Sequence, residues 1–228
     1  ADGIRLRCGL LSKSAETIPY GRIQAVRMIE PFCWRPLGWY RLEIHLAGSA
    51  RKKANEPSRP VRRALLPVGS KNDAELFLRW VLPDHVATLT KPPRRAMLRA
   101  PLSYHFLAAG RNSYCAVSVS GRVRRMTEFA PLSKLQSIRS TQGPVQRWLR
   151  LGSIHLDVAG RRAGVGWLHR SVAEADEWMH TLPPECERAR SLESGPSLDP
   201  PPPSLPGLPL PAPEASGTGP FIGTAPNA

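Results

Sequence analysis

Basic side chains gathered in short, proline-containing stretches offer the clearest chemistry in this chain. Residues 51–63 carry six of them, with two prolines and no apolar periodicity, which is typical of an exposed loop. Near a negatively charged membrane each such cation contributes about 1 kcal/mol of attraction, and salt screens it. The candidate contacts to an anionic surface are Arg51, Lys52, Lys53, Arg59, Arg62 and Arg63.

The charge of the whole chain points the same way. The net charge is +14, and residues 191–228 hold three acids and no base, so residues 1–190 carry +17. Further basic stretches, 91–99 and 122–125, add to this excess. A body this basic favours anionic lipid, acidic proteins or nucleic acid, and solvated loops without any ligand are the plain alternative. No aromatic residues interleave with the bases as a stacking platform requires, so no specific nucleic acid is expected.

Catalytic and metal chemistry have little support in the sequence. The six histidines show no metal-ligand spacing, and no Gly-x-Ser-x-Gly nucleophile elbow occurs. His155 and Asp157 lie two residues apart on an expected strand, so they share a face, where they could form an acid–base pair or simply a polar outer surface. We interpret them as outer-surface residues and expect no enzyme activity, no cofactor and no metal.

Cysteine usage and hydropathy bear on the compartment. The four cysteines have unrelated spacings and no Cys-x-x-Cys pair, which predicts free thiols in a reducing compartment. No signal peptide is visible, and no apolar run reaches the 18 residues of a membrane-spanning helix. Because Ala1 leads directly into domain-like sequence, we expect that an N-terminal part of a longer protein is missing.

An internal repeat organises the elements that must position these residues. With an offset of 112 residues, Gly9–Gly48 aligns with Gly121–Gly160 without a gap, and nine of forty positions are identical, where about two or three would match by chance. We call these copy 1 and copy 2. The identical pairs are Gly9/Gly121, Glu16/Glu128, Pro19/Pro131, Gln24/Gln136, Arg27/Arg139, Arg35/Arg147, Leu37/Leu149, Ala47/Ala159 and Gly48/Gly160. For the repeated arginines, a structural role such as pairing with Glu16 and Glu128 is at least as well supported as ligand contact.

Each copy reads as short strands followed by one helix. Residues 42–46 and 154–158 alternate apolar and polar side chains in the same phase, which predicts half-buried strands with Glu43 and His45 on the outer face. Helices are expected to begin after Ser70 and Ser171, each with an acid three residues on, and to end at Pro83 and Pro184. Between strand and helix, 49–69 and 161–170 are interpreted as connections of unequal length.

The expected fold class is mainly β with α+β character, in two domains. The domains are expected at 1–88 and 103–186, with a linker at 89–102 and a disordered proline-rich tail at 187–228. Eleven of the twenty-five prolines fall in 191–228. Trp34, Trp39 and Tyr40 cluster near one turn, where core packing is favoured over insertion into a membrane interface.

These motifs resemble the bacterial pleckstrin-homology-like domains of the YdbS type over roughly residues 3–185. The resemblance rests on Gly9–Ser12, on Pro19-Tyr20-Gly21-Arg22-Ile23-Gln24-Ala25-Val26 with its counterpart 131–138, on Arg35–Trp39 with 142–149, on Leu46–Gly48 and on His169-Arg170. Arg150 replaces the glycine that Gly38 supplies, so that turn is expected to be rearranged or to have a less favourable backbone conformation.

The resemblance implies two bent antiparallel β-sandwiches, each capped by a C-terminal helix, and a non-enzymatic binding or assembly module. Its relatives usually carry paired transmembrane helices ahead of such domains. We therefore expect association with the cytoplasmic face of a membrane, through anionic headgroups or a membrane protein partner. The alternative is a protein–protein scaffold, which could be a homo-oligomer, that assembles through sheet edges.

Overall fold

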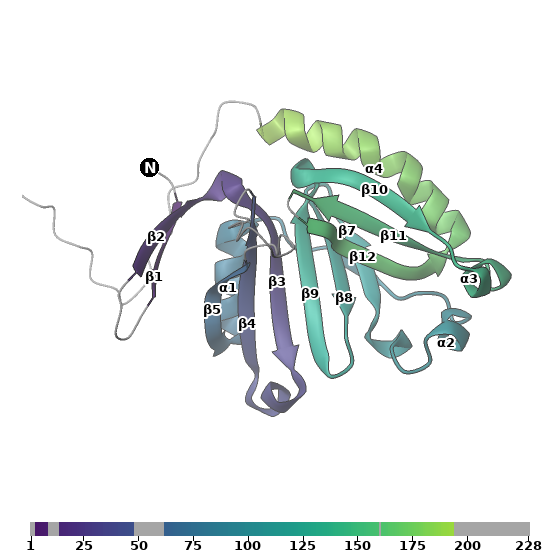
Figure 1. The fold of residues 1–228 in the computed structure, drawn as a ribbon, viewed down its shortest axis with the longest axis horizontal. Coiled ribbons are helices and arrows are strands. Elements are labelled where there is room, and N and C mark those ends of the chain that lie inside the picture. The colour runs from purple at the N-terminus through teal and green to yellow at the C-terminus, as the bar shows by residue number, and fades with distance from the viewer. Residues whose placement is uncertain (1–2, 9–13, 48–61, 160, 194–228) are drawn as a thin grey trace, which may run out of the picture. The chain divides into compact units, whose positions relative to one another are not determined.

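The computed structural model describes residues 3–8, 14–47, 62–159 and 161–193, which lie in one compact unit (Figure 1). From here on, copy 1 and copy 2 denote the repeated segments together with the elements that flank them. Copy 1 comprises β1 (Gly3–Cys8), β2 (Ser14–Pro19), η1 (Tyr20–Arg22), β3 (Ile23–Pro31), η2 (Phe32–Leu37), β4 (Trp39–Leu46), β5 (Arg62–Ser70) and α1 (Lys71–Val81). Copy 2 has the same order in β8 (Cys115–Ser120), β9 (Arg124–Pro131), η4 (Leu132–Lys134), β10 (Leu135–Thr141), α3 (Pro144–Trp148), β11 (Leu151–Val158), β12 (Arg161–Ser171) and α4 (Val172–Glu193). Between the copies lie β6 (Thr88–Thr90), α2 (Ala96–Arg99), η3 (Tyr104–Phe106) and β7 (Ala108–Arg111), so the expected linker contains an edge strand and a short helix.

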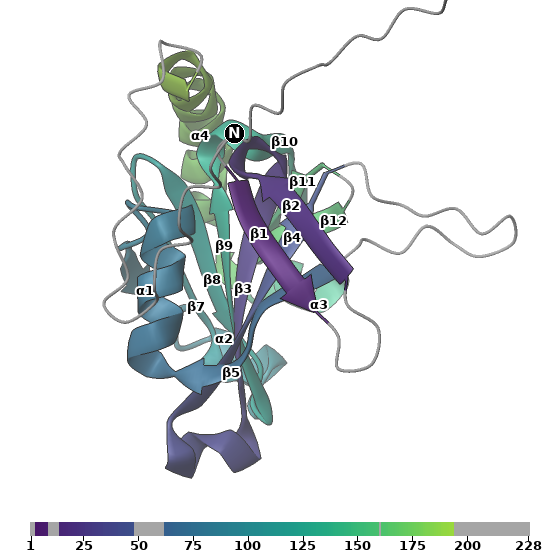
Figure 2. The same cartoon turned by 90° about the vertical axis from the view of Figure 1, so that its left-hand side faces the viewer.

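All strand pairing in the described residues is antiparallel, and it forms three sheets. The largest has seven strands in the order β5-β4-β3-β9-β8-β7-β6, a second has the order β10-β11-β12, and β1 pairs with β2 alone. Helix α1 packs on one face of the large sheet, and the three-stranded sheet packs against the other face in copy 2 (Figures 1 and 2). The predicted fold class, mainly antiparallel β with a C-terminal helix, is confirmed.

The large sheet joins the two copies, because β3 of copy 1 pairs with β9 of copy 2. The ladder runs from Val26 opposite Phe129 to Pro31 opposite Arg124. On the α1 side, the core of copy 1 includes Leu42, Ile44 and Leu78 and extends onto Val117 and Phe129 of copy 2. Copy 2 has its own core, in which Ile154 and Leu156 pack with Trp167 and Trp178.

A buried ion pair lies at this junction. Arg27 and Glu128 face each other across the β3–β9 ladder, and Arg27 Nε donates to Glu128 Oε1 at 2.8 Å. The predicted structural role of Arg27 is therefore confirmed, with its partner supplied by the other copy. The repeated Arg139 instead pairs with Asp157 at 3.2 Å on the surface of its own sheet.

Local sequence signals explain most of these elements. The alternation in β4 and β11 buries Leu42, Ile44 and Leu46 as predicted, together with their counterparts in copy 2. Ser70 caps α1 in a reciprocal capping box with Asp73. Gly38 and Arg150 both have left-handed backbone conformations, with φ of 61° and 51°, as expected for an arginine in a position suited to glycine.

Three expectations are wrong. The connections expected at 49–69 and 161–170 contain β5 and β12, whose prolines and glycines hide the strand pattern. Glu43 and His45 are buried, not on an outer face. Helix α4 continues beyond Pro184 through residues assigned to the tail.

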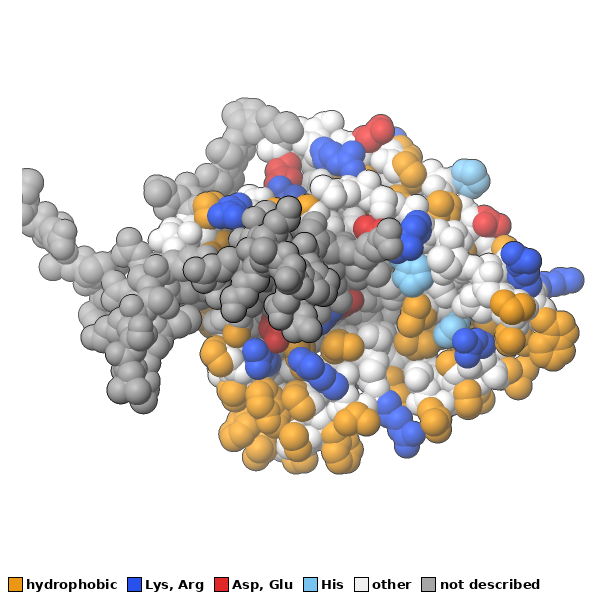
Figure 3. All heavy atoms as spheres, viewed as in Figure 1, with side chains coloured by type: hydrophobic (Ala, Val, Ile, Leu, Met, Phe, Trp, Pro, Cys, Tyr) orange, Lys and Arg blue, Asp and Glu red, His pale blue; other side chains and the backbone are white. Residues whose placement is uncertain are grey.

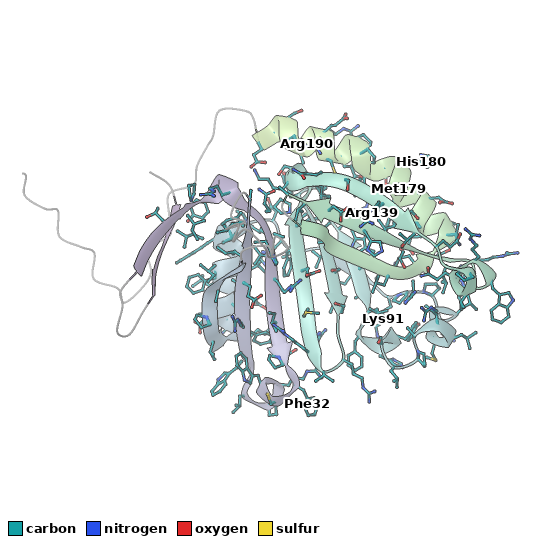
Figure 4. The ribbon with its side chains drawn as sticks, in the orientation of Figure 1. Phe32, Lys91, Arg139, Met179, His180 and Arg190 are labelled. Atoms are coloured by element: carbon teal, nitrogen blue, oxygen red, sulfur yellow. The ribbon has the colours of Figure 1, made fainter. Side chains whose placement is uncertain are left out.

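Tertiary contacts explain the length of α4. Pro183 and Pro184 have no N–H to donate to Met179 and His180, four residues earlier (Figure 4). Beyond them, however, Cys186 and Ala189 are buried, and Arg190 Nη2 donates to the Leu135 carbonyl at 2.6 Å. Packing of the second half against copy 2 therefore outweighs the two missing hydrogen bonds. The proline-rich segment after Glu193 lies outside the described residues.

We expect the ion pair at the junction to be a major determinant of stability. Glu128→Ala leaves the buried guanidinium of Arg27 without this carboxylate, so the free energy of unfolding should fall by about 3 kcal/mol. Chemical denaturation followed by circular dichroism measures this. Glu75→Ala, which removes the carboxylate from an exposed pair with Lys71, is the matched control and should cost less than about 1 kcal/mol. Equal losses for the two variants would contradict a special role for the junction.

Candidate functional site

Large apolar side chains are exposed where copy 1 turns from β3 into β4. In η2 and at the start of β4, Phe32 is 67% exposed, Leu37 58% and Trp39 43%. Val123, in the turn between β8 and β9, lies beside them, because the Phe32 amide donates to its carbonyl at 2.8 Å. We call Phe32, Leu37, Trp39 and Val123 the aromatic tip.

Arg35 fixes the aromatic tip in place. Its Nη2 donates to the carbonyl of Arg122 at 2.9 Å, and its guanidinium lies 5.7 Å from the ring centre of Phe32 and 6.0 Å from that of Phe106. The 3-10 turn ends at Gly38 in a left-handed conformation. Residues from both copies therefore hold η2 in one conformation, and its apolar side chains point outward without collapsing onto the sheet.

A second exposed apolar group lies at the equivalent turn of copy 2. In α3, Trp148 is 80% exposed and Val145 is also exposed. A small core of Ala96, Tyr104, Leu149 and Leu151 joins this turn to the segment around α2. We call the α3 tip the exposed set Val145, Trp148, Met97, Leu98 and Leu102.

Polar contacts brace the α3 tip from inside. The buried Gln146 donates to Ser153 Oγ at 2.9 Å and lies 2.9 Å from His169 Nδ1. Burial, assisted by the nearby charge of Arg99, lowers the pKa of His169. A neutral imidazole in this network can serve as a hydrogen-bond partner without placing a buried charge behind the tip.

Arginine surrounds both tips. Residues 85–156 contain twelve Lys or Arg and a single acid, Glu128, which is engaged by Arg27. Hydrophobic side chains gather along the lower and right-hand rim of the view in Figure 3, with Lys and Arg between them. The exposed bases in residues 85–156 are Lys91, Arg94, Arg95, Arg99, Arg122, Arg124, Arg125, Arg139, Arg147 and Arg150. The arrangement of apolar side chains set among cations suits a surface that is apolar inside and anionic at its boundary.

Only two of the candidate contacts predicted from sequence belong to the described residues. Arg51, Lys52, Lys53 and Arg59 fall outside the described residues. Arg62 and Arg63 belong to the start of β5, opposite His45 and Ile44 of β4, and not to a loop as expected. The sequence interpretation also missed both tips, because it favoured core packing for the aromatic cluster. That preference is wrong for Trp39, while Trp34 and Tyr40 are partly buried, with Trp34 packed edge-on against Trp39.

A cavity of about 340 Å³ lies on the α1 side of the large sheet. Its floor is apolar, with Met28, Val117 and Phe129, and Tyr40 donates to Glu30 at 3.1 Å in its wall. Burial, followed by the charge of Glu30, raises the pKa of Tyr40. This places a phenol that donates a hydrogen bond beside the Glu30 carboxylate in the wall of the cavity.

The other pair considered for chemistry is also engaged in the sheet surface. Asp157 accepts hydrogen bonds from Ser137 Oγ at 2.9 Å and from Arg139, and His155 Nε2 lies 3.1 Å from Thr141 Oγ1. Burial and the charge of Arg139 lower the pKa of His155. Within the described part of the chain, no three His, Cys, Asp or Glu side chains gather where they could hold a metal ion. None of its helices combines the length and apolarity needed to cross a membrane.

Comparison with known protein families identifies both halves of the repeat. The family model described as Bacterial PH domain matches residues 1–85 and 113–182, which cover copy 1 and copy 2 as far as the middle of α4. Comparison with curated proteins and with solved structures gives no match.

The cysteines give a test of the site geometry. Cys33 is exposed in η2, whereas burial raises the pKa of the Cys115 thiol to about 11 and also raises that of Cys186. Because the thiolate is the reactive form, at about pH 8 only about one Cys115 thiol in a thousand is ionised. We expect iodoacetamide to label Cys33 in the native protein and to label Cys115 and Cys186 only after unfolding, as read by peptide mass mapping. Rapid native labelling of Cys115 would contradict this placement.

Proposed function

The chain belongs to the bacterial PH domain family, and from this premise we propose that it is a non-catalytic binding module that docks on an anionic membrane surface. The observation that carries the proposal is the aromatic tip, whose exposed Phe32, Leu37 and Trp39 are held outward beside Arg35 and Arg122. The membrane face would be the cytoplasmic one, where anionic lipids give a negative surface potential.

The energetics favour a bilayer over a purely aqueous role for the aromatic tip. Full burial of a large apolar side chain is worth about 1.5–3 kcal/mol, and aromatic residues are enriched at the level of lipid headgroups. Each arginine near the surface adds about 1 kcal/mol. A few such side chains acting together suffice for reversible binding, although no single one does.

The α3 tip supplies a second point of contact. Both tips are the turn between corresponding strands of the two copies, and both contribute to the apolar rim in Figure 3. Contact at two points would fix how the module is oriented on the bilayer. Residues 85–156, which include the α3 tip and Val123 of the aromatic tip, hold a single acid, so few like charges face the headgroups there.

The basic stretch 51–63 remains part of the proposal as an electrostatic element. Its cations attract the module to the membrane over a range set by screening, about 8 Å at physiological ionic strength. The apolar tips act only on contact. The two elements therefore make separable contributions, one sensitive to salt and one much less so.

Exchange of apolar side chains at the aromatic tip tests the insertion step. Phe32→Ser with Leu37→Ser should lower partitioning onto anionic vesicles by about tenfold or more, because two exposed apolar groups no longer enter the interface. Co-sedimentation with vesicles measures this. Leu192→Ser, an equally exposed leucine on α4, is the matched control and should bind normally. Unchanged binding of the double variant would remove the aromatic tip from the site.

Removal of the cations in 51–63 tests the electrostatic step. Changing Arg51, Lys52, Lys53, Arg59, Arg62 and Arg63 to Ser should strongly reduce binding to anionic vesicles at low salt, since six surface charges are lost. The difference from the unaltered chain should shrink as salt is raised. Equal binding of the unaltered chain to neutral and anionic vesicles would refute the anionic-surface proposal, and absence of binding to both would shift it to a membrane protein partner.

A further inference from the structure

The junction between the copies joins two particular strand edges. At this junction the third strand of copy 1, β3, pairs with the second strand of copy 2, β9. Because the copies have the same element order, copy 2 has its own equivalent of β3, which is β10, and copy 1 has its own equivalent of β9, which is β2. The contact is thus of the head-to-tail kind, which uses two different surfaces and can be repeated from one copy to the next.

In the described part of the chain, no further strand pairs with the equivalent edges, although Arg190 of α4 donates to the Leu135 carbonyl at the start of β10. Strand β10 is the end strand of its sheet, and β2 pairs with β1 alone. The two strands lie apart in Figure 1, and they do not pair within one chain. Unpaired N–H and C=O groups along such an edge are a template for pairing with another strand.

The repeat retains the charged residues of the junction at these open edges. Arg27 and Glu128 form the buried pair, and both are among the nine identical positions, matched by Arg139 on β10 and Glu16 on β2. The side chain of Arg27 is 5% exposed, whereas that of Arg139 is 47% exposed and bonded to Asp157 (Figure 4). One member of the pair is thus present at each of the two edges, Arg139 on β10 and Glu16 on β2, and the two are opposite in charge.

We infer that β10 of one chain pairs with β2 of a second copy, in the antiparallel register that β3 and β9 use within the chain. Arg139 then lies opposite Glu16, and Ile138 opposite Thr17, as Arg27 lies opposite Glu128 and Val26 opposite Phe129. After pairing, one chain keeps its β2 edge and the other keeps its β10 edge, so the pair still has one open edge of each kind. The product is a linear or ring-shaped series of copies.

Side chains at the open edges make this contact weaker than the junction. On the α1 side, the junction is sealed by Cys115, Val117 and Phe129 of copy 2, whose equivalents in copy 1 are Gly3, Arg5 and Thr17. Backbone hydrogen bonds and the ion pair therefore carry the association, with little apolar burial. We expect association that rises with protein concentration and falls with salt.

Charge reversal tests the register. Sedimentation velocity of the full 228-residue chain, without lipid, should show self-association that Arg139→Glu weakens by about tenfold or more, because two acids then face each other. Glu16→Arg should do the same, because two bases then face each other. An equimolar mixture of the two variants should associate again, since the acid introduced at position 139 of one variant then faces the base introduced at position 16 of the other. The double variant should associate for the same reason.

Matched reversals on α4 control for net charge. Arg188→Glu and Glu187→Arg change exposed residues on α4, outside both paired strands, and should associate like the unaltered chain. A strict monomer at high concentration would overturn the inference, as would association that neither Arg139→Glu nor Glu16→Arg alters. Loss of association in the single variants without recovery in the mixture would overturn the proposed register. Because no membrane is present, these outcomes are independent of vesicle binding.

Discussion

Pairing of β3 with β9 is the constraint on which the rest of the structure depends. It makes one sheet from strands of both copies, brings Arg27 against Glu128, and lays the core under α1 across the boundary between the copies. A guanidinium in that setting is stable only while its carboxylate is in place, because an unpaired buried charge is costly. The ion pair also fixes the register of β3 against β9. A slip by one residue would turn Arg27 and Glu128 to opposite faces of the sheet.

The aromatic tip is a consequence of the same pairing. Its apolar residues come from η2 of copy 1 and from the β8–β9 turn of copy 2, and Arg35 reaches from one to the other. Neither copy alone would hold Phe32 and Val123 side by side. The proposed membrane contact therefore depends on the duplication itself, and the α3 tip, built within copy 2 and the segment before it, is the simpler version of the same turn.

Sequence reasoning succeeded where the signal is local. The alternation in 42–46 and 154–158, the capping box at Ser70 and the left-handed turn at Arg150 each depend on a few neighbouring residues, and each is present. It failed where distant contacts decide. The partner of Arg27 lies 101 residues away in the sequence. Helix α4 continues past its prolines because its second half packs against copy 2. The sequence alone also does not distinguish an exposed tryptophan from a buried one. The scarcity of acidic residues in 85–156 was a sequence signal for the site. It could be interpreted only after the structure showed which turns are exposed.

The two copies also differ in the residues at the positions that form the junction in copy 2. Copy 2 has Cys115, Val117 and Phe129 where it is covered by copy 1, and copy 1 has a glycine, an arginine and a threonine in the same places. A gene fragment encoding copy 2 alone would give a protein with a bare apolar face, and two copies of copy 1 in tandem would meet across a polar one. The two halves are therefore not interchangeable at the junction, because the apolar face of copy 2 has no apolar equivalent in copy 1.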